Sequence, residues 1–378
     1  MGLRFDRNEL SGAFGDLGTS LPLVVGMVLA AGLDAAGVLI VFGLMQLGTA
    51  VVYRMPMPVQ PLKAVAAIVI AGQIPAAVVH GGGLAIGAVM LLLSVTGLVG
   101  WLARAIPKAV VRGVQAGLGF QLATLALRDY VPTGGTSGYL LASAAFAVTV
   151  ALLGNRRLPP APVVVALGVV YALVTAADPA ALVAGAGLHL PDVAVPGWPH
   201  VAQGFLLLAL PQIPLSLGNS VLATRQLAED LFPERPPPAV RRIGTTYGVM
   251  NLASAALGGV PVCHGSGGMA GHYAFGGRTG GSVFISGLLY VALGLLFGGA
   301  VAGVITVFPR PVLGVLLLVE ALALLVLLRD LAASPSELGL ALLVAVVAAT
   351  VPYGYLVGMA LGVALMPLAR AGRLRLGR

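Results

Sequence analysis

Long apolar stretches recur along this chain, and they constrain its fold more than any other feature. A helix needs about 20 mostly apolar residues to cross a bilayer, and about fourteen stretches meet or approach that length. Charged residues make up only 9% of the 378 residues and hydrophobic residues 58%, whereas about a quarter of a soluble domain is charged. The expected centres are Leu23, Leu44, Ile68, Leu92, Leu118, Ala147, Val169, Leu210, Leu252, Ala270, Leu293, Leu317, Val344 and Leu361. The sequence therefore predicts an all-α, multi-pass integral membrane protein with about fourteen transmembrane helices.

The distribution of Lys and Arg predicts the orientation of these spans. When the N-terminus is placed in the cytoplasm, 18 of the 21 basic residues fall on the cytoplasmic side. Only Arg128 and Arg310 fall outside, and Lys63 falls within a span. Because cytoplasmic loops carry an excess of Lys and Arg, we expect both termini in the cytoplasm and the protein in the cell (inner) membrane. The net charge of +8 then reflects topology and contact with anionic lipid, and no nucleic-acid partner is expected.

The second half of the chain echoes the first. The stretch LGTS at residues 17–20 recurs as LGNS at residues 217–220, and Pro58-Val59 recurs as Pro261-Val262. Seven spans in each half is an odd number, so the two halves are expected to be inverted relative to each other in the membrane. Inverted repeats with interrupted helices are common in secondary transporters, where the substrate binds near the midplane. The expected repeats are residues 1–178 and 200–378.

The first of two unusual segments precedes the third span and reads RMPMPVQPLK from Arg54 to Lys63. Its prolines cannot lie inside a regular helix, because each lacks an N–H and restricts the residue before it. The chain is expected to enter the membrane extended and to begin a half-helix near Gln60 or Pro61. Irregular backbone at this depth is tolerated where it lines a cavity or is buried in protein. The electropositive start of such a helix favours an anion.

Lys63 lies in the first turn of this expected half-helix. A lysine within a span costs about 2.5–3.5 kcal/mol on insertion scales and is a functional candidate by default. In one interpretation Lys63 faces or supports a substrate site. In the other, its side chain extends to the nearby cytoplasmic interface beside Arg54. The first interpretation is the one we favour.

The second unusual segment, residues 258–272, reads GGVPVCHGSGGMAGH and opens the short tenth span. A glycine-rich turn at the start of a helix can hold an oxyanion with successive N–H groups, although GSGG also permits close helix packing. The segment lacks the Lys-Ser/Thr of a phosphate loop, so a nucleotide site is not expected. His264 is either a hydrogen-bond donor to substrate or a packing and capping residue. His264 and His272 together lack the further ligands of a metal site.

Polar side chains also mark the first span and the eighth, which hold equivalent positions in the two halves. In the eighth span Gln212, Ser216, Asn219 and Ser220 have spacings of three and four residues, which put them on one helical stripe. Such residues also join helices to one another in bilayers, but a stripe in equivalent spans of both halves favours a polar site. The polar residues on or just before the first span are Glu9, Ser11, Asp16, Thr19 and Ser20.

Four stretches of the sequence carry a family resemblance. They are NELSGAFGDLGTSLPL, PMPVQPLKAVAA, LPQIPLSLGNSVLA with the following EDLFP, and GGVPVCHGSGGMAGHYAFGGRTG. These stretches resemble the molybdate transporter family, which is related to the sulfate permeases. The resemblance spans most of the chain and implies the seven-plus-seven inverted-repeat fold of uracil and xanthine permeases, with spans three and ten broken. It also implies molybdate as the favoured substrate, tungstate or sulfate as related oxyanions, and a homodimer.

The same resemblance implies a core domain that moves against a gate domain. The core domain is expected to comprise spans 1–4 and 8–11, and the gate domain spans 5–7 and 12–14. No cytoplasmic regulatory domain is expected, because the chain ends just after the last span. The corresponding residues are approximately 9–104 and 200–305 for the core domain and 105–178 and 306–372 for the gate domain.

We therefore expect a secondary transporter for a tetrahedral oxyanion, in the first place molybdate, that works by elevator-type alternating access. The alternatives are a permease for sulfate or another small anion, and an anion channel on the same fold. An enzyme is not expected, because no nucleophile–base or metal-ligand spacing is present, and neither a cofactor nor a bound metal is expected. Glu9 and Asp16 are possible coupling residues, although Asp16 could instead pair with Lys63. The expected substrate-binding residues are Thr19, Ser20, Gln60, Lys63, Gln212, Asn219, Ser220, His264, Gly265, Ser266, Gly267 and Gly268.

Overall fold

The computed structural model of the chain is helical nearly throughout. It describes residues 2–105, 107–153, 160–175, 180, 185, 187–193 and 195–371. In this described part, five helices are long and apolar enough to cross a membrane, and one bent pair of helices would make a sixth span. The five helices are Ala35–Tyr53, Ala76–Val95, Lys108–Tyr130, Gly281–Ile305 and Arg310–Leu331, and the bent pair is Trp198–Leu215 with Ser220–Leu231.

All fourteen expected span centres lie within helices, but several of these helices are shorter than a full crossing. Six apolar helices contain only 10–17 residues, whereas about 20 are needed to span the hydrocarbon core. The multi-pass membrane character is therefore established, and the count of fourteen spans in two inverted repeats of seven stays a prediction.

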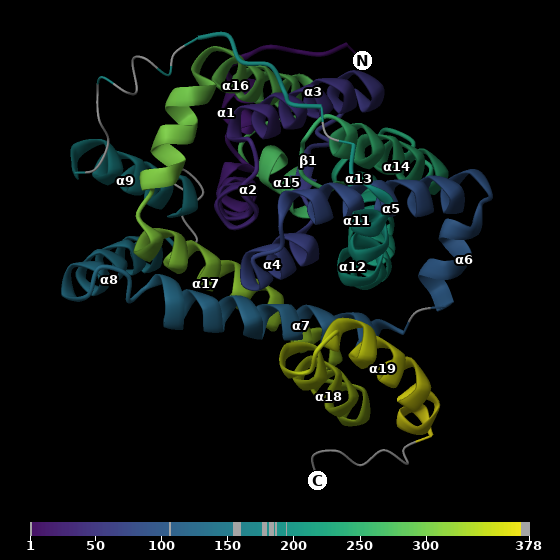
Figure 1. Cartoon of the computed structure of the whole chain (residues 1–378). Helices are drawn as coiled ribbons and strands as arrows, with labels where there is room; N and C mark the ends of the chain where they lie inside the picture. Colours follow the sequence, from purple (N-terminus) through teal and green to yellow (C-terminus); the bar gives the residue numbers. More distant parts are fainter. Residues whose placement is uncertain are drawn as a thin grey trace.

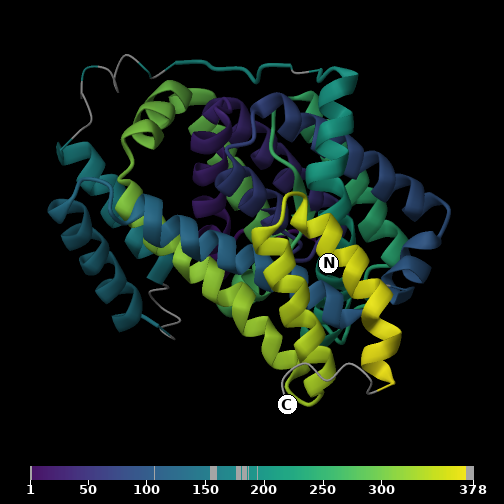
Figure 2. The same cartoon turned by 60° about the horizontal axis from the view of Figure 1, so that its bottom comes forward.

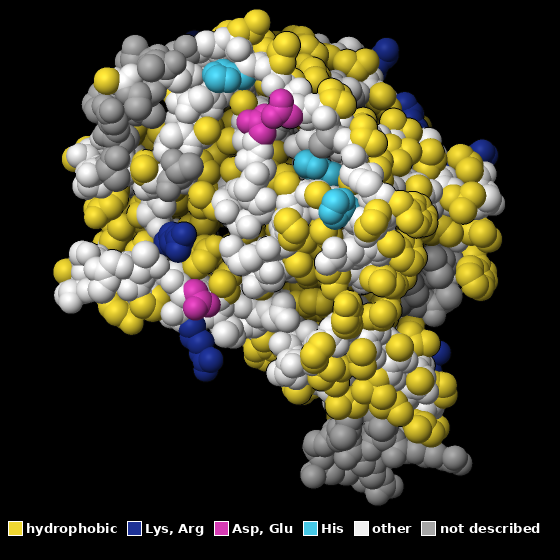
Figure 3. Space-filling view, in the orientation of Figure 1, with side chains coloured by type: hydrophobic (Ala, Val, Ile, Leu, Met, Phe, Trp, Pro, Cys, Tyr) yellow, Lys and Arg dark blue, Asp and Glu magenta, His cyan; other side chains and the backbone are white. Residues whose placement is uncertain are grey.

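Apolar side chains cover much of the outer surface, as Figure 3 shows for one face of the molecule. Leu140 and Val174 on the outer helices are 68% and 79% exposed. Soluble proteins rarely expose contiguous apolar patches larger than a few hundred Å². A surface of this kind is instead suited to contact with lipid chains.

The helices fall into two packing groups that lie side by side (Figures 1 and 2). The first group contains α1 (Arg7–Ala13), α2 (Leu17–Ala31), α3 (Ala35–Tyr53), α4 (Lys63–Gly72), α5 (Ala76–Val95), α6 (Leu98–Ala105), α11 (Trp198–Gly204), the π-helix η2 (Phe205–Ala209), α12 (Leu210–Leu215), the π-helix η3 (Ser216–Leu222), α13 (Ala223–Leu231), α14 (Val240–Ala256), α15 (Ser266–Ala274) and α16 (Gly281–Val307). Within it α3 packs on α16 and α5 packs on α14. Helices from the two halves of the chain are therefore interleaved.

The second group lies along the first and includes the last helices of the chain, at the lower edge of Figure 1. It contains α7 (Lys108–Leu125) with its π-helical continuation η1 (Ala126–Tyr130), α8 (Thr136–Ala151), α9 (Pro160–Thr175), α17 (Arg310–Val326), the 3₁₀-helix η4 (Leu327–Leu331), α18 (Pro335–Thr350) and α19 (Gly354–Arg370). Here α7 packs against α17 and α18, and α18 packs against α19. Helices from both halves are again combined.

Local signals explain where several helices begin and end. The Asp34 carboxylate accepts hydrogen bonds from Ala36 N and Gly37 N at 3.1 and 2.8 Å, so it caps the start of α3. Gly32 ends α2 in the left-handed conformation, with φ of 67°, where a residue with a side chain would be strained. These short-range contacts set the ends of helices whose apolar faces are then fixed by packing.

Two short strands interrupt the helical pattern at the centre of the first group. β1 (Val59–Pro61) pairs antiparallel with β2 (Val262–His264), and Gln60 lies opposite Cys263. The predicted extended segment is therefore present, but α4 begins at Lys63 and not at Gln60 or Pro61. The reason is the strand pairing, which continues through a hydrogen bond from Leu62 N to Pro261 O at 3.0 Å and keeps the backbone extended for two further residues.

Each strand is held at its first residue by one buried amide side chain. On α3, Gln46 donates to Val59 O at 3.0 Å and accepts from Val59 N at 2.8 Å. On α14, Asn251 donates to Val262 O at 2.7 Å and accepts from Val262 N at 2.9 Å. Buried backbone groups need such partners, so the two amides fix the strands within the membrane protein.

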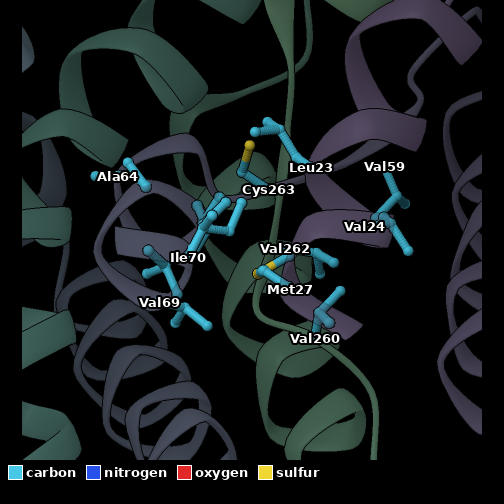
Figure 4. Packing of buried hydrophobic residues seen from close by; sticks show 14 of the residues in the cluster. Leu23, Val24, Met27, Val59, Ala64, Val69, Ile70, Val260, Val262 and Cys263 are labelled. Atoms are coloured by element: carbon cyan, nitrogen blue, oxygen red, sulfur yellow. The ribbon is translucent and has the colours of Figure 1, made fainter. Parts of the chain in front are cut away.

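Apolar packing holds the short helices against these strands. Figure 4 shows Val59 and Val262 of the strands among side chains of α2, such as Leu23 and Met27, and Ile70 of α4. These five residues belong to one buried cluster. The strand pair and the start of α4 are therefore positioned by close packing as well as by hydrogen bonds.

Candidate functional site

A cavity of about 430 Å³ lies where α4 and α15 begin. Its volume falls within the range of roughly 300–1,000 Å³ that is usual for small-molecule sites. The strand pair is antiparallel and each strand leads into a helix, so the N-termini of α4 and α15 both point back toward the pair. The residues predicted from the sequence that line this cavity are Gln60, Lys63, Gln212, Ser220, Gly265, Ser266 and Gly267.

The start of α4 presents both a cation and backbone donors to the cavity. The N-cap residue Leu62 has no polar side chain with which to cap the helix, and Lys63 is the first helical residue. Val65 N donates to Gln212 Oε1 at 3.2 Å. The N–H groups of Lys63 and Ala64, which both line the cavity, have no partner among the described residues. Together with the positive end of the helix dipole, they favour an anion.

Gln212 has a more structural position than the sequence predicts. It lines the cavity, but its oxygen caps α4 at Val65 N and its Nε2 donates to Ser216 Oγ at 3.0 Å. The predicted polar stripe is thus partly satisfied within the protein. Ser220, which lies on the π-helix η3, also lines the cavity. The side chain of Asn219 lies outside the described part of the structure.

Gln60 connects the cavity to the first span. Its Nε2 donates to Asp16 Oδ1 in a short hydrogen bond, and Asp16 Oδ2 accepts from Ser20 Oγ at 2.9 Å. Asp16 and Ser20 therefore approach the cavity through Gln60, and the ion pair recorded for Lys63 is made with another residue. The side chain of Thr19 lies outside the described part of the structure.

The start of α15 contributes backbone and a hydroxyl group. Gly265 is the N-cap and Ser266 is the first residue of the helix. A Cβ atom at Gly267 would meet nothing within 4 Å, whereas a Cβ at Gly265 would overlap the Gln60 side chain. At Gly268 a Cβ would lie 2.7 Å from Pro58 Cγ. Gly267 thus opens onto the cavity. Gly265 and Gly268 allow the segment that contains Pro58 and Gln60 to pack closely against the start of α15.

His264 does not line the cavity. It is fully buried, and its Nε2 lies 2.7 Å from Thr246 Oγ1. Its ring packs edge-on against Tyr53, with the ring centroids 5.3 Å apart. This geometry favours the packing interpretation over direct contact with a substrate. His272 lies in α15 and His264 in β2, so the two rings do not share one helical face.

The buried carboxylate of Glu9 accepts hydrogen bonds from backbone groups far along the chain. The donors are Arg278 N at 3.0 Å, Thr279 N at 2.8 Å and Ser282 N at 2.9 Å. The carboxylate also lies 3.7 Å from the Arg4 guanidinium. The three backbone contacts tie α1 to the segment before α16 and to the first turn of α16. A coupling role for Glu9 stays a prediction.

Two charged residues beside the cavity were not predicted as site residues: Arg112, which lines it, and Glu320, which pairs with Lys63. Glu320 Oε2 lies 3.0 Å from Lys63 Nζ, although Glu320 comes from α17 in the other packing group. The signal was available, because Glu320 interrupts the apolar run VLLLVEALALL. A carboxylate within a span is a functional candidate on the same grounds as Lys63.

A second cavity, of about 720 Å³, lies at the opposite end of α4. It is lined by Ile68 and Gly72 of α4, by Arg128 and Asp129, and by the residues around Tyr355. This cavity is larger and is bordered by the start of α19 (Gly354–Arg370), but its one lining cation, Arg128, is followed directly by the acidic Asp129. The cavity with Lys63 instead combines the starts of two interrupted helices with most of the residues predicted from the sequence, so it is the better candidate for anion binding. α4 has ten residues and spans about 15 Å between the two cavities at 1.5 Å per residue.

Solved structures of anion transporters share this fold. The transmembrane domain of the cyanobacterial bicarbonate transporter BicA superposes with a TM-score of 0.66 at 17% identity, covering 93% of this chain and 98% of that chain. The murine anion transporter SLC26A9 superposes with a TM-score of 0.71 at 14% identity, covering 97% of this chain and 68% of that chain. At these identities the likeness establishes the fold alone.

Sequence comparisons identify the family. The family model described as "Molybdate transporter of MFS superfamily" matches residues 8–122 and 204–324. Molybdate transporter 2 of Arabidopsis thaliana is 34% identical over 375 residues, covering 86% of this chain and 79% of that protein. Molybdate transporter 1 of Chlamydomonas reinhardtii is 32% identical over 471 residues, covering 93% and 90%. The predicted family is confirmed: this chain is an anion transporter that belongs to the molybdate transporter family.

Proposed function

We propose that this protein carries molybdate across the membrane as a secondary transporter. The observation that carries the proposal is the cavity at which two interrupted helices begin, with Lys63 on one of them. The relatives named as molybdate transporters make molybdate the first substrate to test. Tungstate and sulfate, which are also tetrahedral dianions, are the related candidates.

The donors around the cavity match the chemistry of an oxyanion. Molybdate offers four oxygens as hydrogen-bond acceptors and two negative charges. Lys63 supplies one positive charge, and the first turns of α4 and α15 supply N–H groups and the positive ends of two helix dipoles. Ser266, Gly267 and Ser220 border the same space. Thr19, Asn219 and His264 stay predicted contacts, and His264 would have to leave its place beside Tyr53.

The two packing groups support a proposal of alternating access. The group with α4 and α15 corresponds to the expected core domain, and the group with α7 and α17 to the expected gate domain. Cavities at both ends of α4 support a movement that exposes one bound anion first to one side and then to the other. We propose that this movement is of the elevator type. We also propose that the protein is a homodimer in the inner membrane, with both termini of each subunit in the cytoplasm.

The two amide clamps support the inverted repeat. Gln46 holds β1 and Asn251 holds β2, each by both backbone groups of one valine. The clamping helices α3 and α14 occupy the second and ninth positions among the expected spans. The family model also matches one segment in each half of the chain. We therefore propose that residues 1–178 and 200–378 are structural repeats, of opposite orientation in the membrane.

The direct test is uptake of radioactive molybdate into proteoliposomes that contain the purified protein. Saturable uptake is expected, with competition by tungstate and weaker competition by sulfate. Lys63→Met should strongly reduce uptake, whereas Lys108→Met, which removes a 59% exposed lysine side chain, should leave it close to wild type. Preference for sulfate would identify a sulfate permease, large non-saturating currents a channel, and absence of anion uptake would refute the proposal.

A further inference from the structure

The carboxylate of Glu320 is an unexpected charge beside a site for anions. Glu320 lies in the middle of the apolar helix α17 and is 7% exposed. A carboxylate in a span is costly to bury and is rarely kept there without a function. Nothing in the proposed transport reaction so far assigns a role to this group.

The geometry places Glu320 on the face of α17 that borders the cavity. Residues 320, 323, 324 and 327 follow a spacing that puts them on one helical face. Ala323, Leu324 and Leu327 line the cavity, and Glu320 lies one turn before them. The Lys63 side chain is 40% exposed, whereas that of Glu320 is 9% exposed. The ammonium group thus remains accessible from the cavity, and the carboxylate lies behind it.

The two cations of α7 near the cavity, of which Arg112 lines it, already share an acidic partner. On α7, Arg112 and Lys108 both contact Asp330 of η4, at 2.5 and 3.3 Å. Among the described residues, Lys63 is the one cation within ion-pair distance of Glu320. The state of Glu320 therefore depends first on Lys63.

The two cations that line the cavity, Lys63 and Arg112, are both paired with a carboxylate, Lys63 with Glu320 and Arg112 with Asp330. When Glu320 is ionised, its charge cancels that of Lys63, and an arriving dianion meets a carboxylate of like charge. Because the Glu320 side chain is only 9% exposed, that repulsion is screened less than between two groups in bulk water. A dianion therefore gains the full attraction of Lys63 only when Lys63 is no longer paired with Glu320.

We infer that Glu320 is a competing counter-ion, which holds Lys63 in the empty carrier and is displaced from it by the oxyanion. The inference rests on the proposed function and adds a regulatory step to it. Because Lys63 belongs to one packing group and Glu320 to the other, their ion pair joins the two groups while the site is empty. Binding of the anion breaks this link, so that occupancy of the site frees one group to move against the other.

Binding to the Glu320→Gln variant tests the competition. Equilibrium binding of radioactive molybdate to purified protein is expected to become at least about tenfold tighter, because the competitor for Lys63 is removed. Glu320→Asp, whose shorter carboxylate loosens the pair, should show an intermediate gain and provides the test if Glu320→Gln does not fold. A residue with only a structural role would weaken binding or leave it unchanged when replaced, and either result would overturn the inference.

Two further comparisons test the inference: the first separates competition for Lys63 from general repulsion, and the second tests the dependence on the charge of the anion. In a Lys63→Met background, Glu320→Gln should give a much smaller gain, because no ammonium group remains to be released. Perrhenate is a tetrahedral oxyanion with a single charge, so its gain from Glu320→Gln should be smaller than that of molybdate. An equal gain in the Lys63→Met background, or an equal gain for both anions, would contradict the inference.

The wild-type protein distinguishes failure of the inference from failure of the proposed function. If wild type binds no molybdate and Glu320→Gln binds none either, the proposed substrate is wrong. If wild type binds molybdate and Glu320→Gln binds it no more tightly, the substrate stands and Glu320 is not its competitor.

Discussion

The starts of α4 and α15 enter the same cavity in similar ways but present different chemistry to it. Each follows a three-residue strand, and each strand is clamped by one buried amide, from Gln46 or Asn251. The first helical residue, however, is Lys63 in α4 and Ser266 in α15. The two halves therefore share a backbone frame, while the charge is confined to one of them.

This difference indicates that the two helix starts have different roles in anion binding. The glycines around α15 allow close approach, and Gly267 faces open space, so this half offers mainly backbone dipoles. The α4 half offers a full charge that is shared with Glu320 of the other packing group. The α15 side is therefore expected to shape the anion site, and the α4 side to control its occupancy.

The largest expected effect is on stability and concerns the two buried amides that hold the strands. Gln46→Leu or Asn251→Leu leaves the N–H and C=O of one buried valine unpaired, at a cost of about 1–3 kcal/mol for each group. If the two clamps are equivalent, both variants should lose similar stability, which thermal unfolding in detergent can measure. A variant as stable as wild type would show that its strand does not depend on the clamp.

A smaller but more specific effect is expected from the charge. Lys63→Met removes a charge-assisted contact worth about 1.5–3 kcal/mol, which corresponds to about 10- to 150-fold weaker molybdate binding. Because this variant also leaves Glu320 without its cation, Lys63→Met/Glu320→Gln is the matched control and should bind weakly too. Binding near the wild-type level in both variants would remove Lys63 from the site.

The two helix interruptions at the site could be predicted from the local sequence. The prolines before Lys63 and the glycines around Ser266 indicate interrupted helices, because neither segment suits a regular helix. The structure shows both interruptions, and Gln60, Lys63 and Ser266 line one cavity. Local backbone chemistry and the cost of a buried charge were sufficient for these predictions.

The remaining features depend on contacts between distant segments, which a single sequence does not specify. The strand pairing that delays α4 until Lys63 joins residues about 200 positions apart. The partner of Lys63 is set by the placement of α17, and His264 is turned toward Tyr53 by the packing of α3 and α14. Glu320 could have been found as a buried charge, but its pairing with Lys63 could not.

Substitution of two glycines probes how tightly the α15 start is packed. In Gly265→Ala the new Cβ would overlap Gln60, and overpacking of this kind typically costs about 1–3 kcal/mol. In Gly267→Ala the Cβ enters open space, so stability should stay within about 0.5 kcal/mol of wild type. Unfolding measurements on the two variants should therefore diverge. Equal stabilities would mean that Gly265 and Gln60 do not pack as closely as described.

The smallest expected effect comes from the residue that matches Lys63 in position. Ser266→Ala removes a neutral hydroxyl group, and a neutral hydrogen bond contributes about 0.5–1.5 kcal/mol, or about 2- to 13-fold in affinity. Molybdate binding to Ser266→Ala should therefore weaken less than binding to Lys63→Met. Because Ser266 carries no charge, its replacement should also affect molybdate and singly charged perrhenate alike, whereas Lys63→Met should affect molybdate more. A loss as large and as charge-dependent as that of Lys63→Met would mean that the two helix starts recognise the anion equally, against the asymmetry inferred from their first residues.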